Sequence, residues 1–494
     1  MSSLFHNLIL LSPEVAIVGF LVLLFLCDGF VPETRKSYFP LIITLLGCGF
    51  AAFLTWRIGD AQTHFFSGLV ANDGLSKFFR YLFFFATATS LYLGFGSKEI
   101  ETKSRMEFSL LLLCVTFGMS IMAISTNLLM LYIGIETVSI VSFVLAGFRR
   151  DNLRSNEASF KYLVFGALAS GLMVYGFSLL YGYAGSLSYS EIGRYLRIHH
   201  GDIPFIITIA WVMIFSGVAY KISAFPMHFW TPDVYEGSPI PVATFFSVGP
   251  KAAGFAALLR ILMDIFTVKV GVGQWAAITD KPLIGVLAIL AAATMLIGNL
   301  SAIHQKSVKR MLAYSSIAHV GYLLMGLVTL SSSGIVAVLF YLIVYYAMNL
   351  GAFWVVSVVS DRNGSDDIQA FSGMGWRMPL LGVCMSVFLF SLTGIPLFGG
   401  FVGKFLLFGA VLQAPGFLWL AIFGVLNSVV SLYYYARVLK AMWFERPESA
   451  YTPESLPLYH AVGLVGLAVP TVILGLFFGP VIQFAQRTLA YFLG

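Results

Sequence analysis

The sequence predicts an all-α polytopic membrane protein with about 14 transmembrane helices, arranged as two inverted five-helix repeats with broken helices. Composition is the first reason: 59% of the 494 residues are hydrophobic and 11% are charged, whereas soluble domains carry about 25% charged residues. Mean hydropathy is +0.88. Apolar runs of about 20 residues, enough to cross roughly 30 Å of hydrocarbon, recur from end to end. The short alternating segments typical of a transmembrane barrel are absent from the sequence.

Each expected helix is an apolar run of spanning length, interrupted by polar or charged connections. The run 378–412 is too long for one straight span and contains Gly394, Pro396, Gly399 and Gly400 near its middle, so we predict a helix broken there. We expect helices at 8–28, 38–56, 75–95, 106–126, 128–147, 158–183, 204–224, 239–264, 277–301, 308–330, 333–360, 378–412, 415–441 and 457–480.

Basic residues are concentrated in the connections that follow odd-numbered helices. These are Arg35 and Lys36; Lys98, Lys103 and Arg105; Arg149, Arg150 and Arg154; Lys306, Lys309 and Arg310; Arg362 and Arg377; and Arg437, Lys440 and Arg446. The even-numbered connections hold fewer, namely Arg57, Lys77, Arg194, Arg197, Lys269 and Lys281. The positive-inside rule therefore places the odd connections in the cytoplasm and both termini on the opposite, periplasmic side. We attribute the net charge of +6 to this orientation and expect no nucleic-acid partner.

An internal repeat is visible in short motifs. Residues 223–226 (SAFP) resemble residues 393–396 (TGIP), and an Asn-Leu pair precedes each at 127–128 and 299–300. From Asn to Pro the separations are 226 − 127 = 99 and 396 − 299 = 97 residues. We predict helices 1–3 in 1–105, a first five-helix repeat in 106–264, a second in 277–441 and a final helix in 442–494. Because five is odd, the second repeat enters the membrane inverted. Chance similarity of short proline motifs is the alternative.

Four ionisable residues interrupt apolar runs: Glu136, Lys221, Lys251 and Lys404. A charge at membrane depth costs at least about 2.5–3.5 kcal/mol, so these residues indicate a buried polar track that handles protons or other cations. Lys221 lies five residues before Pro226 and Lys404 eight after Pro396, where broken helices expose backbone groups that can solvate an ammonium. The alternative is snorkelling of the lysine side chain to the interface, which suits Lys161 at the start of its helix best.

The lone carboxylate of Glu136 would take up a proton unless a cation lies near it, and we propose Lys221 as its partner. Separating the two would push a proton toward Lys251, because lysine can switch its charge where arginine cannot. His319 could relay protons between Lys251 and Lys404, and Tyr433 could donate to a water chain. Packing roles for His319 and Tyr433 are the alternative. We interpret His228, His304, Asp233 and Glu236 as interfacial polar residues.

Several classes of chemistry lack their signatures. The sequence has no phosphate-binding Walker loop, no glycine-rich Rossmann opening and no haem attachment motif. The four cysteines, Cys27, Cys48, Cys114 and Cys384, are scattered in apolar runs without metal-ligand spacing. We therefore expect no metal site, no cofactor and no redox or hydrolytic centre in this chain.

Four long motifs resemble the antiporter-like membrane subunits of proton-pumping NADH:quinone oxidoreductase (respiratory complex I), and the resemblance covers essentially the whole chain. They are residues 128–140 (LLMLYIGIETVSI), 221–245 (KISAFPMHFWTPDVYEGSPIPVATF), 304–322 (HQKSVKRMLAYSSIAHVGY) and 394–405 (GIPLFGGFVGKF). Within this family the chain is most similar to the N-type subunit, on the basis of Val-Tyr after Asp233 and a lysine at 404.

The resemblance implies a proton-translocating module driven by quinone reduction elsewhere in the complex. Glu136, Lys161, Lys221, Lys251 and Lys404 match the proton-path residues of the family, and His319 and Tyr433 match less securely. The resemblance also implies that NADH, FMN, iron–sulfur clusters and quinone belong to other subunits. It implies neighbouring antiporter-like and small membrane subunits as partners, besides lipids, and a bacterial inner membrane as the location.

Two other functions remain open on the sequence. One is a subunit of a Mrp-type multisubunit cation/proton antiporter or a membrane-bound hydrogenase, which share this fold family. The other is a membrane scaffold without a proton path, in which substitution of Lys221 or Glu136 would leave pumping unchanged.

Overall fold

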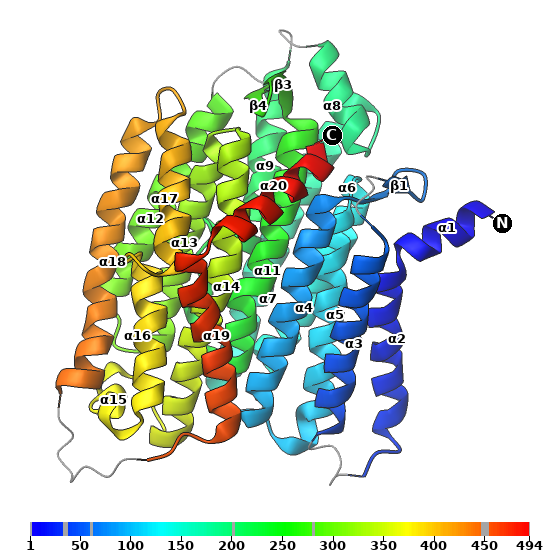
Figure 1. The fold of residues 1–494 in the computed structure, drawn as a ribbon. Coiled ribbons are helices and arrows are strands. Elements are labelled where there is room, and N and C mark those ends of the chain that lie inside the picture. Colours follow the sequence, from blue (N-terminus) through cyan, green and yellow to red (C-terminus); the bar gives the residue numbers. More distant parts are fainter. Residues whose placement is uncertain are drawn as a thin grey trace.

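The computed structural model describes residues 2–32, 38–59, 63–199, 203–278, 282–445 and 454–493. Long helices run side by side through a single bundle, and both chain ends lie at the same end of it, the upper end in Figure 1. In the described residues, 12 helices are long and apolar enough to cross a membrane, and two shorter apolar helices accompany them. The predicted fold class, an all-α polytopic membrane protein, is confirmed.

The N-terminal helices stand at one side of the bundle, and a small β-hairpin lies between α3 and α4 (Figure 1). Their bounds are α1 Ser2–Leu10, α2 Ser12–Asp28, α3 Phe39–Arg57, β1 Thr63–Phe65, β2 Val70–Asn72 and α4 Gly74–Gly96. The expected span 8–28 is wrong at its start, because α1 is a separate helix and α2 begins at Ser12 with Pro13 in its first turn. Proline fits there, since the first helical N–H groups have no partner to lose.

The next stretch contains five long helices or broken pairs. Their bounds are α5 Arg105–Ile124, α6 Leu128–Ala146, α7 Leu153–Ala184, α9 Phe205–Ile222 with α10 Trp230–Gly237, and α11 Ile240–Arg260, and the short helix α8 Tyr189–Ile198 follows α7. A π-helical turn, Ile261–Ile265, extends α11. The hairpin β3 Thr267–Gly271 and β4 Gln274–Ala277 comes next. The expected span 277–301 therefore begins too early, because Ala277 belongs to β4.

The following stretch has the same order of elements. Its bounds are α12 Pro282–Ile303, α13 Val308–Val328, α14 Ser332–Asn363, α15 Met374–Arg377, α16 Pro379–Thr393, α17 Gly399–Leu412 and α18 Leu418–Phe444. Helices α7 and α14 hold corresponding places, and each is 32 residues long. Each also ends at a glycine in the left-handed conformation, Gly185 and Gly364. This parallel is a likeness between the two stretches, and the repeat boundaries and the inverted relationship stay predictions.

The chain ends in α19 Leu458–Leu476 and α20 Gly479–Leu493. The sequence reasoning did not foresee α20, which crosses the face of the bundle diagonally in Figure 1 and packs against α4 and α14. Its Ala485, Leu489 and Phe492 are buried. These positions recur at helical spacing and form the narrow apolar stripe of a helix lying on a surface.

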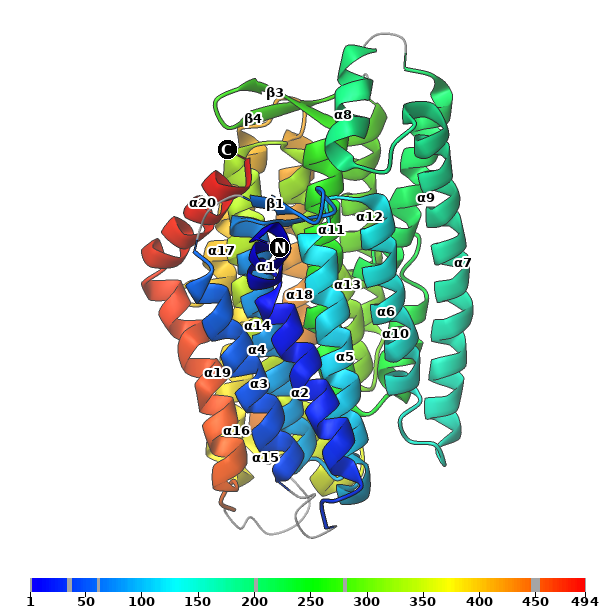
Figure 2. The same cartoon turned by 90° about the vertical axis from the view of Figure 1, so that its right-hand side faces the viewer.

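Helices in the middle of the bundle are the most buried. All 21 residues of α11 are buried, and α13 and α14 are nearly so, whereas α3 and α19 present much of their apolar surface outward. In Figure 2 the two hairpins and α8 lie at the same end as both termini. Of the basic residues used to predict orientation, Arg35, Lys36, Lys281 and Arg446 lie outside the described residues.

Candidate functional site

Three lysines predicted to lie at membrane depth are buried in the bundle. Lys221 at the end of α9, Lys251 in α11 and Lys404 in α17 are each at most 3% exposed. A snorkelling lysine keeps its ammonium in water, so this burial does not fit snorkelling. Lys161 on α7 differs, because its side chain is partly exposed.

Lys251 has a neutral hydrogen-bond partner. Its Nζ donates to Ser316 Oγ on α13 at 2.7 Å and lies 5.6 Å from the ring centre of Tyr235 on α10. These contacts bring together a lysine from the first stretch of helices and a hydroxyl from the second.

Lys404 lies at the break between α16 and α17. Its Nζ donates to the carbonyls of Leu392 and Thr393 at 3.0 and 2.8 Å and to Ser428 Oγ at 2.9 Å. The last carbonyls of a helix have no partner within it and carry its negative dipole end. A helix that stops at Thr393 therefore presents acceptors to an ammonium. The Nζ also lies 4.7 Å from the ring centre of Tyr322.

Glycines make this second break possible. Gly394 has φ +92°, in the left-handed region that favours glycine. A Cβ on Gly400 would lie 1.8 Å from the carbonyl oxygen of Ser391, so α17 can start this close to α16 only with glycine there. Pro396 and Gly399 flank the turn, as the sequence predicts for a helix break.

The first break, between α9 and α10, has a different lysine arrangement. Helix α9 ends at Ile222, Ser223 adopts φ +66° and Pro226 follows in the connecting turn. The break is held by Phe225 N donating to Thr294 Oγ1 at 3.0 Å and by Trp230 Nε1 donating to the carbonyl of Tyr220 at 3.0 Å. Lys221 Nζ has no hydrogen-bond partner among the described residues.

Glu136 on α6 does not form an ion pair with Lys221 in the described part of the chain. Its carboxylate instead accepts a hydrogen bond from Ser170 on α7. A direct ion pair is thus not made in this conformation, although the carboxylate of Glu136 lies near enough to act electrostatically on Lys221.

Lys161 belongs to a charged cluster that the sequence reasoning missed. Its Nζ contacts Asp233 and Glu157, each at 2.7 Å, and Arg310 on α13 contacts Asp233 at 2.9 Å and also pairs with Glu236. These side chains line a cavity of about 290 Å³. Asp233 and Glu236, interpreted as interfacial, are three residues apart on α10 and so share one face of it. That spacing, next to a helix break, is the signal that was available in the sequence.

His319 on α13 is buried between two tyrosines. Its Nδ1 lies 2.6 Å from the hydroxyl of Tyr341 on α14, and its Nε2 lies 3.2 Å from the hydroxyl of Tyr435 on α18. Tyr435 also shares a hydrogen bond with Ser315. His319 therefore connects three helices between Lys251 and Lys404.

Tyr433 does not belong to this set, and its assignment is corrected here. It is 58% exposed, on the same outward face of α18 as Leu426 and Val429. The buried neighbours are Tyr434 and Tyr435. Three consecutive tyrosines point in different directions from a helix, about 100° apart, and the sequence alone did not tell which of them faces inward.

A second polar chain links α12 to α18. Tyr434 donates to Asn299 Oδ1 at 2.9 Å, and Asn299 Nδ2 donates to Asn427 Oδ1 at 3.2 Å. Among the described residues, no group of three or more His, Cys, Asp or Glu side chains could hold a metal ion.

Comparison with known proteins gives a consistent family. Residues 125–431 match the family model described as NADH:quinone oxidoreductase/Mrp antiporter, TM. NADH-quinone oxidoreductase subunit N 2 of Sorangium cellulosum is 42% identical over 493 residues, covering 97% of this chain and 96% of that protein.

Solved structures share the fold. A chain in respiratory complex I from Thermus thermophilus with bound aureothin is 31% identical, with a TM-score of 0.78, and the match covers 96% of this chain and 99% of that one. A chain of the Mrp complex from a Dietzia species has a TM-score of 0.84 at 21% identity, covering 99% of this chain and 98% of that one, which shows the fold alone. The protein therefore belongs to the NADH:quinone oxidoreductase/Mrp antiporter membrane-subunit family and, within it, to the N subunits of NADH-quinone oxidoreductase.

Proposed function

We propose that this chain is the proton-translocating membrane subunit N of an NADH:quinone oxidoreductase, and that it moves protons along Glu136, Lys161, Lys221, Lys251, His319 and Lys404. The observation that supports this most is the burial of three lysines on three different helices, with hydroxyl, imidazole and carbonyl groups between Lys251 and Lys404. A buried amine is costly to keep unless it has a function.

The partners of the lysines suit proton transfer. Lys251 and Lys404 contact a hydroxyl, backbone carbonyls and aromatic rings, and neither contacts a carboxylate among the described residues. A neutral acceptor stabilises an ammonium less than a carboxylate does, so less stabilisation is lost when the proton leaves. Lysine can release that proton, whereas arginine cannot.

His319 serves as the relay between the two lysines. Its two ring nitrogens face the hydroxyls of Tyr341 and Tyr435, and an imidazole can accept a proton at one nitrogen and release it at the other. Among the residues that the structure describes, several buried hydroxyls nearby, those of Tyr235, Tyr322 and Tyr345, make no hydrogen bond of normal geometry. Buried polar groups are normally satisfied by protein or ordered water, so we expect water to bridge the intervals between these residues.

Glu136 acts as the electrostatic switch in this scheme. In the conformation described here its carboxylate is held by Ser170, and a second conformation pairs it with Lys221. Formation and loss of that pair alternately favours and disfavours the charged form of Lys221. Moving one elementary charge across the membrane against its potential costs about 2.3 kcal/mol per 100 mV. Quinone reduction elsewhere in the complex supplies this free energy.

The scheme assigns redox chemistry to other subunits. NADH, FMN, iron–sulfur clusters and quinone bind outside this chain, and the whole complex is the translocase. The partners are the neighbouring antiporter-like and small membrane subunits, and the location is a bacterial inner membrane with both termini in the periplasm. The basic connections of the odd-numbered helices support this orientation.

A Mrp-type antiporter subunit or a membrane-bound hydrogenase subunit is the second candidate, supported by the shared fold alone. Proteins that co-purify with the chain separate the two. Flavin and iron–sulfur subunits together in the purified complex support the first candidate. Iron–sulfur subunits without a flavin subunit support a hydrogenase, and a complex of membrane subunits only supports the antiporter.

The substitution Lys251→Arg tests the proton path directly. Arginine keeps the positive charge but stays protonated, so we expect proton translocation by the assembled complex to fall about 100-fold. Proton uptake by membrane vesicles during NADH oxidation measures this. Lys269→Arg, on the exposed hairpin, is the matched control and should pump normally. Undiminished pumping by Lys251→Arg, at a normal amount of assembled complex, refutes the path.

A further inference from the structure

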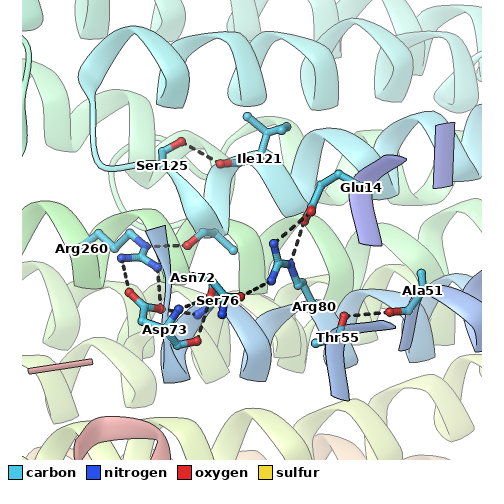
Figure 3. A network of polar contacts seen from close by, with 11 residues as sticks. Glu14, Ala51, Thr55, Asn72, Asp73, Ser76, Arg80, Ile121, Ser125 and Arg260 are labelled. Carbon is cyan, nitrogen blue, oxygen red and sulfur yellow. Dashed lines mark hydrogen bonds and ion pairs between the residues drawn. The ribbon is translucent and has the colours of Figure 1, made fainter. Parts of the chain in front are cut away.

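Two buried arginine–carboxylate pairs lie outside the proton path, and Figure 3 shows their contacts. They lie where α4 begins and α11 ends, at the end of the bundle that carries both termini (Figure 1). Glu14 on α2 pairs with Arg80 on α4, and Asp73 pairs with Arg260 at the end of α11. All four side chains are at most 2% exposed. Charges so buried are costly unless their geometry is good, and the function proposed above does not use them.

Both pairs have the two-pronged geometry of a strong arginine–carboxylate contact. Arg80 donates to the two carboxylate oxygens of Glu14 at 2.7 and 2.9 Å and to Asn72 Oδ1 at 2.8 Å. Arg260 donates to the two oxygens of Asp73 at 2.9 Å each. Such forks fix orientation as well as distance, so each arginine has little freedom to rotate or slide.

The two pairs are joined through consecutive residues. Asn72 ends β2 and Asp73 caps α4, where its side chain accepts from Ser76 N at 2.8 Å while Ser76 Oγ accepts from Asp73 N at 2.9 Å. Asp73 therefore holds the start of α4 and Arg260 at the same time. In Figure 3 these side chains form one line of contacts from Glu14 to Arg260.

Arg260 is also held by two further elements. Its Nε donates to the carbonyl of Ala123 near the end of α5 at 2.5 Å, and its guanidinium lies 5.4 Å from the ring centre of Phe492 on α20. The end of α11 is thus attached to α4, α5 and α20 through one side chain. We call Asp73, Ala123, Arg260 and Phe492 the α11 clamp.

The clamp and the proton path share helix α11. Lys251 lies nine residues before Arg260, or about 13.5 Å along the helix axis at 1.5 Å per residue. Pro250 stands just before Lys251, and a proline inside a helix removes a backbone hydrogen bond and permits bending there. Lys251 and Arg260 both lie after Pro250, in the C-terminal half of α11. The clamp therefore holds the half of the helix that carries Lys251.

We propose that the α11 clamp positions Lys251 against Ser316, with α4, α5 and α20 as its fixed support. Arg260 itself carries no proton, because arginine stays protonated. The clamp prevents α11 from sliding or turning when charges move along the path. This role rests on the function proposed above, because it places Lys251 for proton transfer.

The test compares Arg260→Lys and Asp73→Asn with Glu14→Gln in the assembled complex. Both clamp variants lose the fork that holds α11, so we expect fewer protons per NADH oxidised at a normal amount of complex. Glu14→Gln breaks the other pair, which does not contact α11, and serves as the matched control. Its proton yield per NADH should equal that of the unsubstituted complex, whatever its effect on stability.

Three outcomes decide the matter. An unchanged proton yield in both clamp variants overturns the clamp while leaving the proton path intact, provided that Lys251→Arg abolishes pumping. If Lys251→Arg pumps normally, the proposed function itself fails. If neither clamp variant assembles while Glu14→Gln does, Arg260 serves folding alone, and the positioning role is overturned.

Discussion

Lys221, Lys251 and Lys404 are the same residue type in three different environments. Lys404 is surrounded by carbonyl and hydroxyl oxygens, Lys251 has one hydroxyl partner, and Lys221 has none among the described residues. The surroundings therefore stabilise the three ammonium groups to different degrees. As a result, three chemically identical side chains differ in how readily they release a proton. A proton path needs such differences to have a direction.

Tyr435 provides a prediction at this scale. Tyr435→Phe removes the hydroxyl that contacts His319 and Ser315 with almost no change in volume. We expect proton translocation to fall about tenfold, equivalent to about 1.4 kcal/mol in the barrier. Vesicle proton uptake driven by NADH measures it. Tyr433→Phe, two residues away and exposed, should leave the rate unchanged, and equal losses in the two variants would argue against a relay through Tyr435.

At the scale of elements, the two helix breaks are built with different residues. The first depends on a left-handed Ser223, on a hydrogen bond that Thr294 accepts and on one that Trp230 donates. The second depends on glycines that let α16 and α17 approach closely. Both end a helix next to a buried lysine, but Lys221 precedes its break and Lys404 follows its break. The α9–α10 break and the α16–α17 break thus place a lysine beside a helix terminus with different residues around it.

The approach of α17 to α16 can be tested with alanine. Gly400→Ala would place a Cβ 1.8 Å from the carbonyl oxygen of Ser391, so we expect a loss of about 1–3 kcal/mol from overpacking. The control is Gly409→Ala on the same helix, where a Cβ meets nothing within 4 Å. That change should stabilise α17 by about 0.5–1 kcal/mol. Stepwise heating of the purified complex in detergent measures both, and similar melting of the two variants would contradict the close approach.

At the scale of the whole molecule, charged groups occupy the two ends of the bundle in different ways. The Lys161, Asp233, Glu236 and Arg310 cluster lines a cavity, while the α11 clamp and the Glu14–Arg80 pair are buried at the end with the termini. Lys251 and His319 lie between these ends on α11 and α13, two helices with little outward surface. A buried core of this kind keeps lipid away from the lysines.

The orientation of the bundle leads to a labelling prediction. Both termini and the hairpin that holds Lys269 lie at one end (Figure 2), and the positive-inside rule puts that end in the periplasm. In intact spheroplasts, a membrane-impermeant maleimide should label Lys269→Cys. Arg150→Cys, in the highly exposed connection between α6 and α7, should react only after lysis. The reverse pattern would show that the chain has the opposite orientation.

Much of the site was recognisable from individual residues. Ionisable side chains in apolar runs stand out because their burial is expensive, so Glu136, Lys221, Lys251 and Lys404 were found without a structure. Prolines and glycines inside such runs likewise indicated both breaks, since they disrupt helical hydrogen bonding or permit unusual backbone angles. What failed was the rotational setting of α18, as with Tyr433. Its three consecutive tyrosines have the same side chain, so only contacts with neighbouring helices decide which of them face inward.

The sequence by itself determined the membrane class, the approximate spans and the identity of the buried charges, because hydropathy and proline placement act locally along the chain. Only the tertiary structure decided which groups meet. Glu136 accepts a hydrogen bond from Ser170 and forms no direct ion pair with Lys221 in the described residues. Asp233 pairs with both Lys161 and Arg310. At the end of the bundle with the termini, Glu14 pairs with Arg80 and Asp73 pairs with Arg260. Those contacts join residues up to 187 positions apart, and partners at such separation depend on how helices pack, which no local pattern encodes.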